Sequence, residues 1–327
     1  MDMLWSVLLF AVGLVLLIKG GDWFVDGATG IAKRFRLPDI VVGATVVSIG
    51  TTLPEVMVST TGALAGSGAM AYGNAIGSII CNTALIAAIS IAVNPGPVNV
   101  KSMKTPAIFF FFSAAIYCVA AYFLGTFPRW MGFAMLAIFV VYMLLTVRNG
   151  LKNPDAVSEE EEEEGGKEKQ LWQELLLLVV GAAVIAVGAD LLVDHGQIIA
   201  IKLGVPETVV ALLFVALGTS LPELVTTITS LRKGRASLGV GNVIGANVFN
   251  LVLVSGVAVS LAPFDVPVEN TLLDTGLNLS LVFDIPVMLG VMSLMIFPAL
   301  IGKKLSRWQG IALLCIYAAF CVCQFML

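Results

Sequence analysis

Two short polar motifs interrupt long apolar runs of this 327-residue chain, and each motif ends in a glutamate. The first reads Gly-Thr-Thr-Leu-Pro-Glu over residues 50–55, and the second reads Gly-Thr-Ser-Leu-Pro-Glu over residues 218–223, 168 positions later. A carboxylate inside an apolar membrane segment costs about 2.5 kcal/mol or more on insertion scales. Because the chain carries this cost twice at matching places, we expect Glu55 and Glu223 to act together.

Each motif gathers oxygen atoms on one face of a helix. Hydroxyl residues stand three and four positions before each glutamate, namely Thr51 and Thr52 in the first motif and Thr219 and Ser220 in the second. The proline of each motif lacks an N–H, so the carbonyl four residues earlier loses its partner and the helix should break there. Carboxylates, hydroxyls and free carbonyls are ligands of hard cations such as Ca²⁺ and Na⁺.

The next apolar run in each half adds a second set of oxygens. Ser78 and Asn82 are four apart in the first half, whereas Asn250 matches Asn82 and Ala246 replaces the serine in the second. Two ionised glutamates are neutralised by one Ca²⁺ or two Na⁺, and protons could also neutralise them because burial favours the uncharged carboxyl. A ligand set without cysteine or histidine argues against zinc, copper and iron.

The composition is that of a polytopic membrane protein, with 58% hydrophobic and only 12% charged residues. Runs of membrane-spanning length recur along the whole chain. We predict ten transmembrane helices at about 4–27, 38–65, 70–93, 105–124, 129–148, 171–194, 206–231, 236–262, 284–301 and 308–326. The first span should be retained, because residues 1–6 contain no Lys or Arg and make a poor signal peptide.

Basic residues predict the orientation of these spans. If the N-terminus lies outside, fifteen lysines and arginines fall in inside loops and only two fall in outside loops. Both termini should then face the outside, and the polar segment 149–170 should be a cytoplasmic linker. The run of glutamates at residues 159–164 is typical of a solvated charge cluster, with a weak regulatory cation site as the alternative.

The two halves are copies of one sequence. At an offset of 168, matches run without a gap from Asp22 to Pro95 and include Gly73-Asn74 with Gly241-Asn242. We therefore divide the chain into five-helix repeats at 1–148 and 171–327, with 149–170 between them. Because five is odd, the second repeat is inserted upside down, an architecture typical of secondary transporters whose substrate binds between the repeats.

Other polar residues in apolar surroundings have simpler explanations. Asp22, Asp26, Asp190, Asp194 and His195 fall near predicted helix ends, where capping or packing accounts for them, and Asp284 before Pro286 is expected to cap a helix N-terminus. The five cysteines show no metal or redox spacing and are expected to be apolar fillers. No basic stripe with interleaved aromatics suggests nucleic acid, and no nucleophile–base pair suggests an enzyme.

The paired motifs, within 43–82 and 211–250, resemble the two α-repeats of the Ca²⁺/cation antiporter superfamily, the sodium/calcium exchangers. Prokaryotic members, including a potassium-dependent-like branch, are the most similar in size. The resemblance covers nearly the whole chain and implies that ions bind among the second, third, seventh and eighth helices. The residues that it implies are Glu55, Glu223, Asn82 and Asn250 at the centre, Thr51, Ser78, Thr219 and Ser220 at flanking sites with Thr52 close by, and the carbonyls of Ser48 and Ala216.

This resemblance implies an antiporter of a prokaryotic plasma membrane that exchanges Ca²⁺ for Na⁺ by alternating access, with spans one and six moving against the core. We expect it to act as a monomer in the lipid bilayer, without cofactors. Two departures bear on coupling, because several exchangers carry aspartate at the position of Asn250 and often serine at that of Ala246. The alternatives are a proton/calcium exchanger and a potassium-dependent exchanger. A cation channel is a further alternative, but it agrees less well with inverted repeats.

Overall fold

The computed structural model describes residues 3–152, 170–203, 218–267 and 277–326, and these are almost entirely helical. Within those ranges eight helices are long and apolar enough to cross a membrane, and a bent pair, Asp39–Thr51 with Leu53–Leu64, raises the number to nine. The all-α, multi-pass membrane fold is thereby confirmed. The predicted span 206–231 falls partly outside the described residues, so the count of ten stays a prediction.

The first half consists of α1 (Met3–Phe35), α2 (Asp39–Val42), η1 (Gly43–Val47), α3 (Ser48–Thr51), α4 (Leu53–Leu64), α5 (Gly68–Cys81), η2 (Asn82–Ala87), α6 (Ala88–Val93), α7 (Val100–Val119), η3 (Ala120–Leu124) and α8 (Arg129–Leu151). The second half consists of α9 (Leu171–Lys202), α11 (Leu221–Arg232), α12 (Ala236–Phe249), η6 (Asn250–Val254), α13 (Ser255–Leu261), η8 (Ser280–Asp284), α14 (Ile285–Gly302) and α15 (Arg307–Met326). The η elements are π-helical turns within longer helices. Sequence patterning did not predict the four two-residue strands, which pair antiparallel as β1 (Gly96–Pro97) with β4 (Lys304–Leu305) and β2 (Thr126–Phe127) with β3 (Phe264–Asp265).

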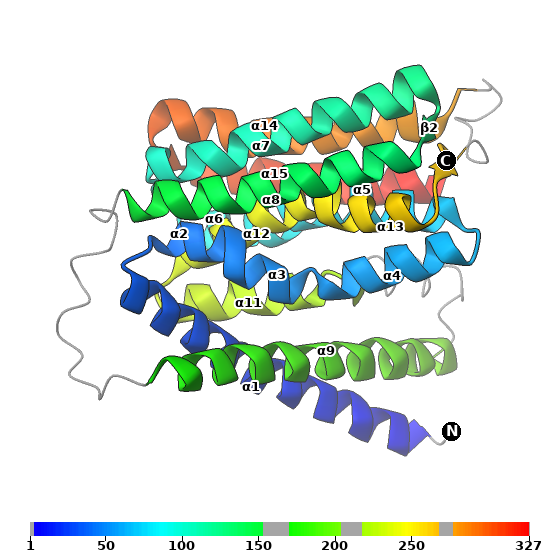
Figure 1. Cartoon of the computed structure of the whole chain (residues 1–327). Coiled ribbons are helices and arrows are strands. Elements are labelled where there is room, and N and C mark those ends of the chain that lie inside the picture. Colours follow the sequence, from blue (N-terminus) through cyan, green and yellow to red (C-terminus); the bar gives the residue numbers. More distant parts are fainter. Residues whose placement is uncertain (1–2, 153–169, 204–217, 268–276, 327) are drawn as a thin grey trace.

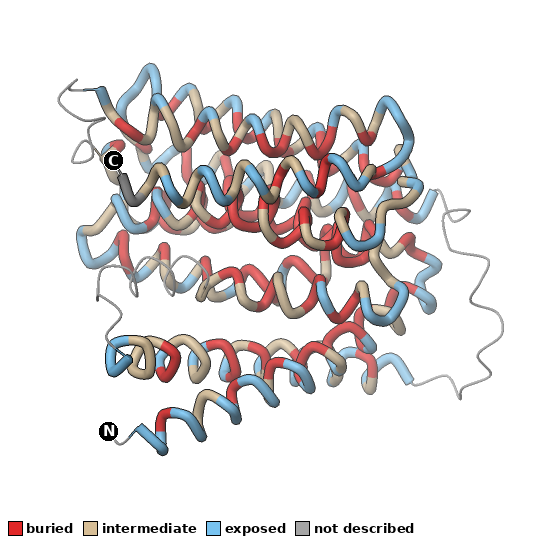
Figure 2. Tube along the Cα trace, turned by 180° about the vertical axis from the view of Figure 1, so that it is seen from behind, coloured by how far each residue is buried: buried red, intermediate tan, exposed pale blue. Residues whose placement is uncertain are grey.

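The helices are stacked in layers (Figure 1). The pair α1 and α9 lies at one side, the broken helices α2–α4 and α11 come next, and α7, α8, α14 and α15 lie beyond. Buried residues concentrate in the middle of this stack (Figure 2), where the spans built on α5 and α12 are 72% and 89% buried, against 22% for α1 and for α9. The core therefore surrounds the two helices that follow the glutamate motifs.

Helices α1 and α9 pack tightly through repeated glycines. A Cβ at Gly13 would lie 2.9 Å from the carbonyl of Gly188, and one at Gly20 would lie 3.1 Å from the carbonyl of Gly181. Gly13 and Gly181 are matching positions of the repeat, as are Gly20 and Gly188. The contact is therefore the same surface used twice in opposite directions, and small residues allow the two backbones to approach.

The equivalent helices of the two halves run in opposite directions in Figure 1. Helix α1 starts at the marked N-terminus and α9 starts at the far end of the molecule, and α4 and α11 likewise point opposite ways. This arrangement is the one that an inverted repeat requires. The exact domain boundaries stay predictions.

Three sequence expectations about helix ends are wrong. Helices α1 and α9 extend well beyond the predicted spans 4–27 and 171–194, so Asp22, Asp26, Asp190, Asp194 and His195 lie inside helices. Asp284 does not cap a helix, because its backbone is helical and the chain is already coiled from Ser280. Its carboxylate instead accepts a hydrogen bond of 2.6 Å from the amide of Gln324 on α15. Hydropathy windows stop at charged residues, whereas an amphipathic helix continues past the membrane.

Candidate ion-binding site

The first glutamate motif breaks its helix at the residue two positions before the proline. Thr52 separates α3 from α4, and the segments Asp39–Thr51 and Leu53–Leu64 meet at an angle of 46°. Ser220 stands at the matching place before α11, with φ −90° and ψ 4°, and residues 204–217 before it lie outside the described ranges. Proline occupies the second position of α4 and of α11, where its missing N–H costs no intrahelical bond. The predicted break is therefore present in the first motif, and each motif places its glutamate in the first turn of a helix.

Glu55 and Glu223 are both completely buried. All four carboxylate oxygens have no hydrogen-bond partner within the described part of the chain. The two side chains lie close enough for their charges to interact, and Glu223 lies beside the hydroxyls of Thr51 and Thr52 from the other half. Helix N-termini favour negative charge, but that effect is small against the cost of burying unpaired carboxylates.

Asn82 and Asn250 open π-helical turns on the two central helices, as the first residues of η2 and η6. Each asparagine is fully buried, and neither its amide oxygen nor its amide nitrogen has a partner among the residues described. The turn η2 packs against α11, which carries Glu223, and η6 packs against α4, which carries Glu55. Single π turns inside α-helices are frequent at functional sites.

Two further asparagines, Asn74 and Asn242, form hydrogen bonds between the halves. They are matching positions of the sequence repeat but were not among the predicted site residues. The hydroxyl of Thr51 donates to Asn242 Oδ1 at 3.1 Å, and that of Thr219 donates to Asn74 Oδ1 at 3.4 Å. Ser78 also donates to Asn74, at 3.5 Å. Their recurrence in the Gly-Asn-x-Ile-Gly motif of both halves was the available signal.

The remaining predicted residues are placed as follows. The hydroxyls of Thr52 and Ser220 are buried without a hydrogen-bond partner in the described ranges. The carbonyl of Ser48 accepts the backbone N–H of Thr52 at 3.0 Å, and its hydroxyl donates to Gly43 and Asn242. Ala216 lies outside the described residues. Ten of the eleven predicted residues thus lie on α3, α4, α5, η2, α11 and η6 or directly before α4 and α11, and these elements contact one another.

An apolar cleft of about 880 Å³ is lined by α9 and by the residues around both glutamate motifs. Gly50, Pro54 and Met57 line it from the first half, and Thr219 and Pro222 line it from the second. Thr219 belongs both to the cleft and to the polar contacts of the site, so the cleft reaches the edge of the site.

Helices α1 and α9 contact both breaks directly. The ring of Phe24 on α1 lies where a Cβ of Gly50 would be, at 2.8 Å, and Val193 on α9 lies 3.1 Å from the equivalent point at Gly218. Any shift of the α1–α9 pair would therefore act on the backbone beside both glutamates.

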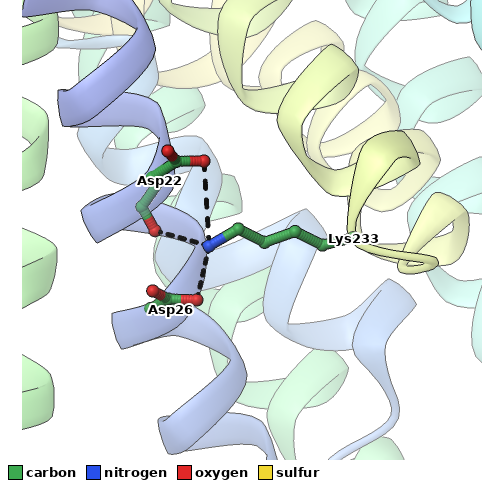
Figure 3. Close-up of polar contacts among 3 residues, drawn as sticks. All are labelled: Asp22, Asp26 and Lys233. Atoms are coloured by element: carbon green, nitrogen blue, oxygen red, sulfur yellow. Dashed lines mark hydrogen bonds and ion pairs between the residues drawn. The ribbon is translucent and has the colours of Figure 1, made fainter.

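One charged contact joins α1 to the C-terminal end of α11 (Figure 3). The Lys233 ammonium donates to the Asp26 carboxylate at 2.6 Å and to the Asp22 backbone carbonyl at 3.1 Å. The nearest Asp22 carboxylate oxygen is 3.9 Å away. The side chains are 30% to 45% exposed, so water screens the pair.

The layered membrane fold, with two oppositely directed halves and buried polar side chains where they meet, is the architecture of a secondary transporter. The model of the sodium/calcium exchanger protein family matches residues 5–148 and 174–326. The chain is 30% identical to the sodium/calcium exchanger MaX1 of Methanosarcina acetivorans, over 98% of each protein. It is 32% identical to an uncharacterized membrane protein of Methanocaldococcus jannaschii, over 94% of each. A solved structure of the sodium-calcium exchanger NCX_Mj superposes with a TM-score of 0.78 at 31% identity, covering 97% of this chain and 98% of that one.

The chain belongs to the sodium/calcium exchanger family. It is accordingly a multi-pass membrane protein and a cation exchanger rather than an enzyme, and the ions it moves are substrates rather than cofactors.

Proposed function

We propose that this protein exchanges Ca²⁺ for Na⁺, with both ions binding in turn to Glu55 and Glu223. The observation that carries this proposal is the burial of two carboxylates and two asparagine amides that have no hydrogen-bond partner among the described residues. Buried polar groups of this kind are normally satisfied, and an intramembrane carboxylate is expected to take part in function. A bound cation would satisfy the carboxylate and amide oxygens of all four side chains at once.

The chemistry of the ligands favours hard cations over transition metals. Carboxylate, amide, hydroxyl and carbonyl oxygens suit Ca²⁺ and Na⁺, and no group of three or more His, Cys, Asp or Glu in the described ranges could hold a metal. Two ionised glutamates match one Ca²⁺ or two Na⁺ in charge. Occupancy by one ion therefore excludes the other, which is the basis of exchange.

Hydroxyls at the flanks provide further Na⁺ ligands in this proposal. Thr51 and Thr52 lie beside Glu223, and Thr219, Ser220 and Ser78 form the equivalent set in the other direction. The carbonyls of Ser48 and Ala216 complete the set by family resemblance. Ala246 supplies no hydroxyl at the position of Ser78, so the two flanks are unequal and the stoichiometry can differ from that of exchangers with a serine there.

Alternating access is proposed to arise from movement of α1 and α9 against the rest. These two helices pack mainly on each other, are the least buried long helices with α15, and contact both helix breaks. Their sliding would open the site to one side of the membrane at a time. An exchange of three Na⁺ for one Ca²⁺ would move one net charge and respond to voltage by about 2.3 kcal/mol per 100 mV.

The test is uptake of ⁴⁵Ca²⁺ into proteoliposomes loaded in turn with Na⁺, K⁺ or acid, for the unmodified protein and for Glu55→Gln and Glu223→Gln. We expect outward Na⁺ gradients to drive uptake, and either substitution to abolish it. Asp284→Asn is the matched control, because it removes an intramembrane carboxylate that is bonded to Gln324 away from the site. Uptake that survives both glutamine substitutions would refute the proposal.

The same experiment separates the alternatives for coupling. Uptake driven by a proton gradient in sodium-free vesicles would indicate proton/calcium exchange. A requirement for K⁺ on the side of Ca²⁺ would indicate a potassium-dependent exchanger. Flux without any counter-ion would indicate a channel.

A further inference from the structure

A stripe of buried hydroxyls continues from Glu223 along α11. Thr226, Thr227 and Ser230 follow the glutamate by three, four and seven positions, so they share its face of the helix. Their exposed fractions are 0%, 2% and 0%. The stripe ends one turn before Lys233, at the end of α11 that is predicted to face the cytoplasm.

None of these three hydroxyls has a hydrogen-bond partner within the described residues. Some membrane hydroxyls donate to their own helix, as Thr45 does to Val41 and Ser260 does to Gly256, whereas single ones such as Ser113 and Thr146 also lack a partner in the described ranges. The same local bond would be open to the α11 hydroxyls by side-chain rotation. Three hydroxyls on one helix face that all lack this bond are better explained by a polar species, such as water or a cation, in the space that they face.

The matching face of α4 is different. The positions equivalent to Thr226, Thr227 and Ser230 are Val58, Ser59 and Gly62. Ser59 is satisfied, because Asn74 donates its amide to it at 2.8 Å. The equivalent residues of the second half, Thr227 and Asn242, do not form this hydrogen bond. Neither Thr227 Oγ1 nor Asn242 Nδ2 has a partner among the residues described. The stripe therefore does not follow from the repeat and belongs to the α11 half alone.

We infer that the α11 stripe of Thr226, Thr227 and Ser230 lines the inner pathway by which Na⁺ and Ca²⁺ pass between Glu223 and the cytoplasmic side. This inference rests on the proposed exchange function. A cation that leaves two carboxylates must keep oxygen ligands as it moves, and hydroxyls spaced one helical turn apart, about 5.4 Å, provide them. The buried Asn242 amide nitrogen, which also lacks a partner in the described ranges, can hold a water that travels with the ion.

Helix α1 packs on α11 at the level of the stripe but on the adjoining face of that helix. A Cβ at Gly21 would lie 2.7 Å from Val225 Cγ1 and 2.8 Å from the hydroxyl of Thr229. Just beyond, Lys233 donates to Asp22 and Asp26 of α1 (Figure 3). In this proposal, opening toward the cytoplasm includes the separation of α1 from this flank of α11, which is the movement proposed for exchange.

The test places single cysteines on α11 in a variant whose five native cysteines are replaced and whose transport is retained. Thr226→Cys and Ser230→Cys are exposed to a charged, membrane-impermeant thiol reagent from either side of oriented vesicles during exchange. We expect the reagent to react from the cytoplasmic side only and to block transport. Ile228→Cys is the control, because Ile228 lies between the stripe residues in sequence but is 38% exposed on the outer surface of the helix.

Two outcomes would overturn the inference, namely no reaction of Ser230→Cys from the cytoplasmic side during exchange, or reaction from the outer side alone. Labelling does not depend on which ions are coupled, so it can succeed while the Na⁺/Ca²⁺ proposal fails, and the reverse also holds. If the cysteine variants do not fold, Ser230→Ala and Thr226→Val provide a second measurement. We expect each to slow Ca²⁺ release to the cytoplasmic side by roughly threefold to tenfold, the size of one lost polar contact. Unchanged release rates in both would argue against the pathway.

Discussion

At the level of single residues, the burial of Glu55 and Glu223 sets the main energetic problem of the molecule. Each carboxylate is fully removed from water, and the two lie in one buried region. Asn82 and Asn250 add buried amides without partners in the described ranges. The ion-free protein should therefore be less stable than its helical packing alone would allow, and ion binding should restore that stability.

This reasoning predicts the behaviour of Glu223→Gln. At mildly alkaline pH the ion-free variant should be more stable than the unmodified protein by about 1–3 kcal/mol, because a neutral amide costs less to bury than an unpaired charge. The rise in melting temperature on adding Ca²⁺ should disappear. Thermal unfolding in detergent with and without Ca²⁺ measures both effects. A full Ca²⁺-dependent rise in the variant would show that Glu223 is not a ligand, and Asp284→Asn should keep that rise.

At the level of helices, the glycines decide which elements can approach and move together. Gly13, Gly20, Gly181 and Gly188 allow α1 and α9 to form one tight unit. Gly43 allows η1 to pack on α12, and Gly241 allows α12 to pack on α2, since a Cβ on either glycine would collide with the backbone opposite. The first contact holds the helices proposed to move, and the second holds the core together.

Gly20→Val should weaken the α1–α9 unit. The added Cβ would lie 2.9 Å from the backbone nitrogen of Ile185, so the helices must separate, at a cost of about 1–3 kcal/mol. Unfolding in detergent measures the loss. Gly290→Ala is the control, because that glycine has no described atom within 4 Å of its Cβ position and should gain up to about 1 kcal/mol as a helical alanine. Equal stability of the Gly20→Val variant would contradict the packing described.

Lys233→Gln tests the contact between α1 and α11. The ion pair is partly exposed, so its loss should cost only about 0.2–1 kcal/mol, which shifts the balance toward conformations with α1 displaced by less than about sixfold. Distances between labels on α1 and α11 measure this shift. The control is Arg232→Gln, because Arg232 makes no ion pair among the described residues. If the charge-reversed pair Lys233→Asp with Asp26→Lys restores the original population of conformations, the effect is due to this ion pair. If Lys233→Gln leaves that population unchanged, the ion pair does not stabilise the α1–α11 contact.

At the level of the whole molecule, the distribution of charge predicts how the chain sits in the membrane. The basic ends of α11 and α12 and the linker 149–170 should face the cytoplasm, and both termini should face outside. An impermeant reagent on intact cells should modify a cysteine after Met326 and spare one placed in the linker. The opposite pattern would invert the topology and with it the side assigned to the α11 pathway. A single chain supplies both glutamates, so the monomer stays our prediction of the functional unit.

Much of this architecture was readable in the sequence, because the relevant signals are local or repeated. Apolar runs gave the membrane spans, Pro54 and Pro222 gave the helix breaks, and the 168-residue offset gave the opposed halves. Helix ends near charged residues were less predictable, as Asp22, Asp190 and Asp284 show, since hydropathy does not report where a helix continues beyond the membrane. The hydrogen bonds of Asn74 with Thr219 and of Asn242 with Thr51 were not predicted, because their partners lie 145 and 191 residues apart and no local sequence pattern indicates such contacts.

The sequence by itself determined that two glutamates lie at matching proline motifs in a membrane protein. These features depend only on the composition and spacing of residues within each short segment. Only the tertiary structure decided that these carboxylates share one buried space, that the α11 hydroxyls lack partners, and that α1 rests on Thr229 and Lys233. Those facts depend on how close distant helices come. That distance is set by side-chain volume at the contacts, where a glycine or a single methyl group changes it.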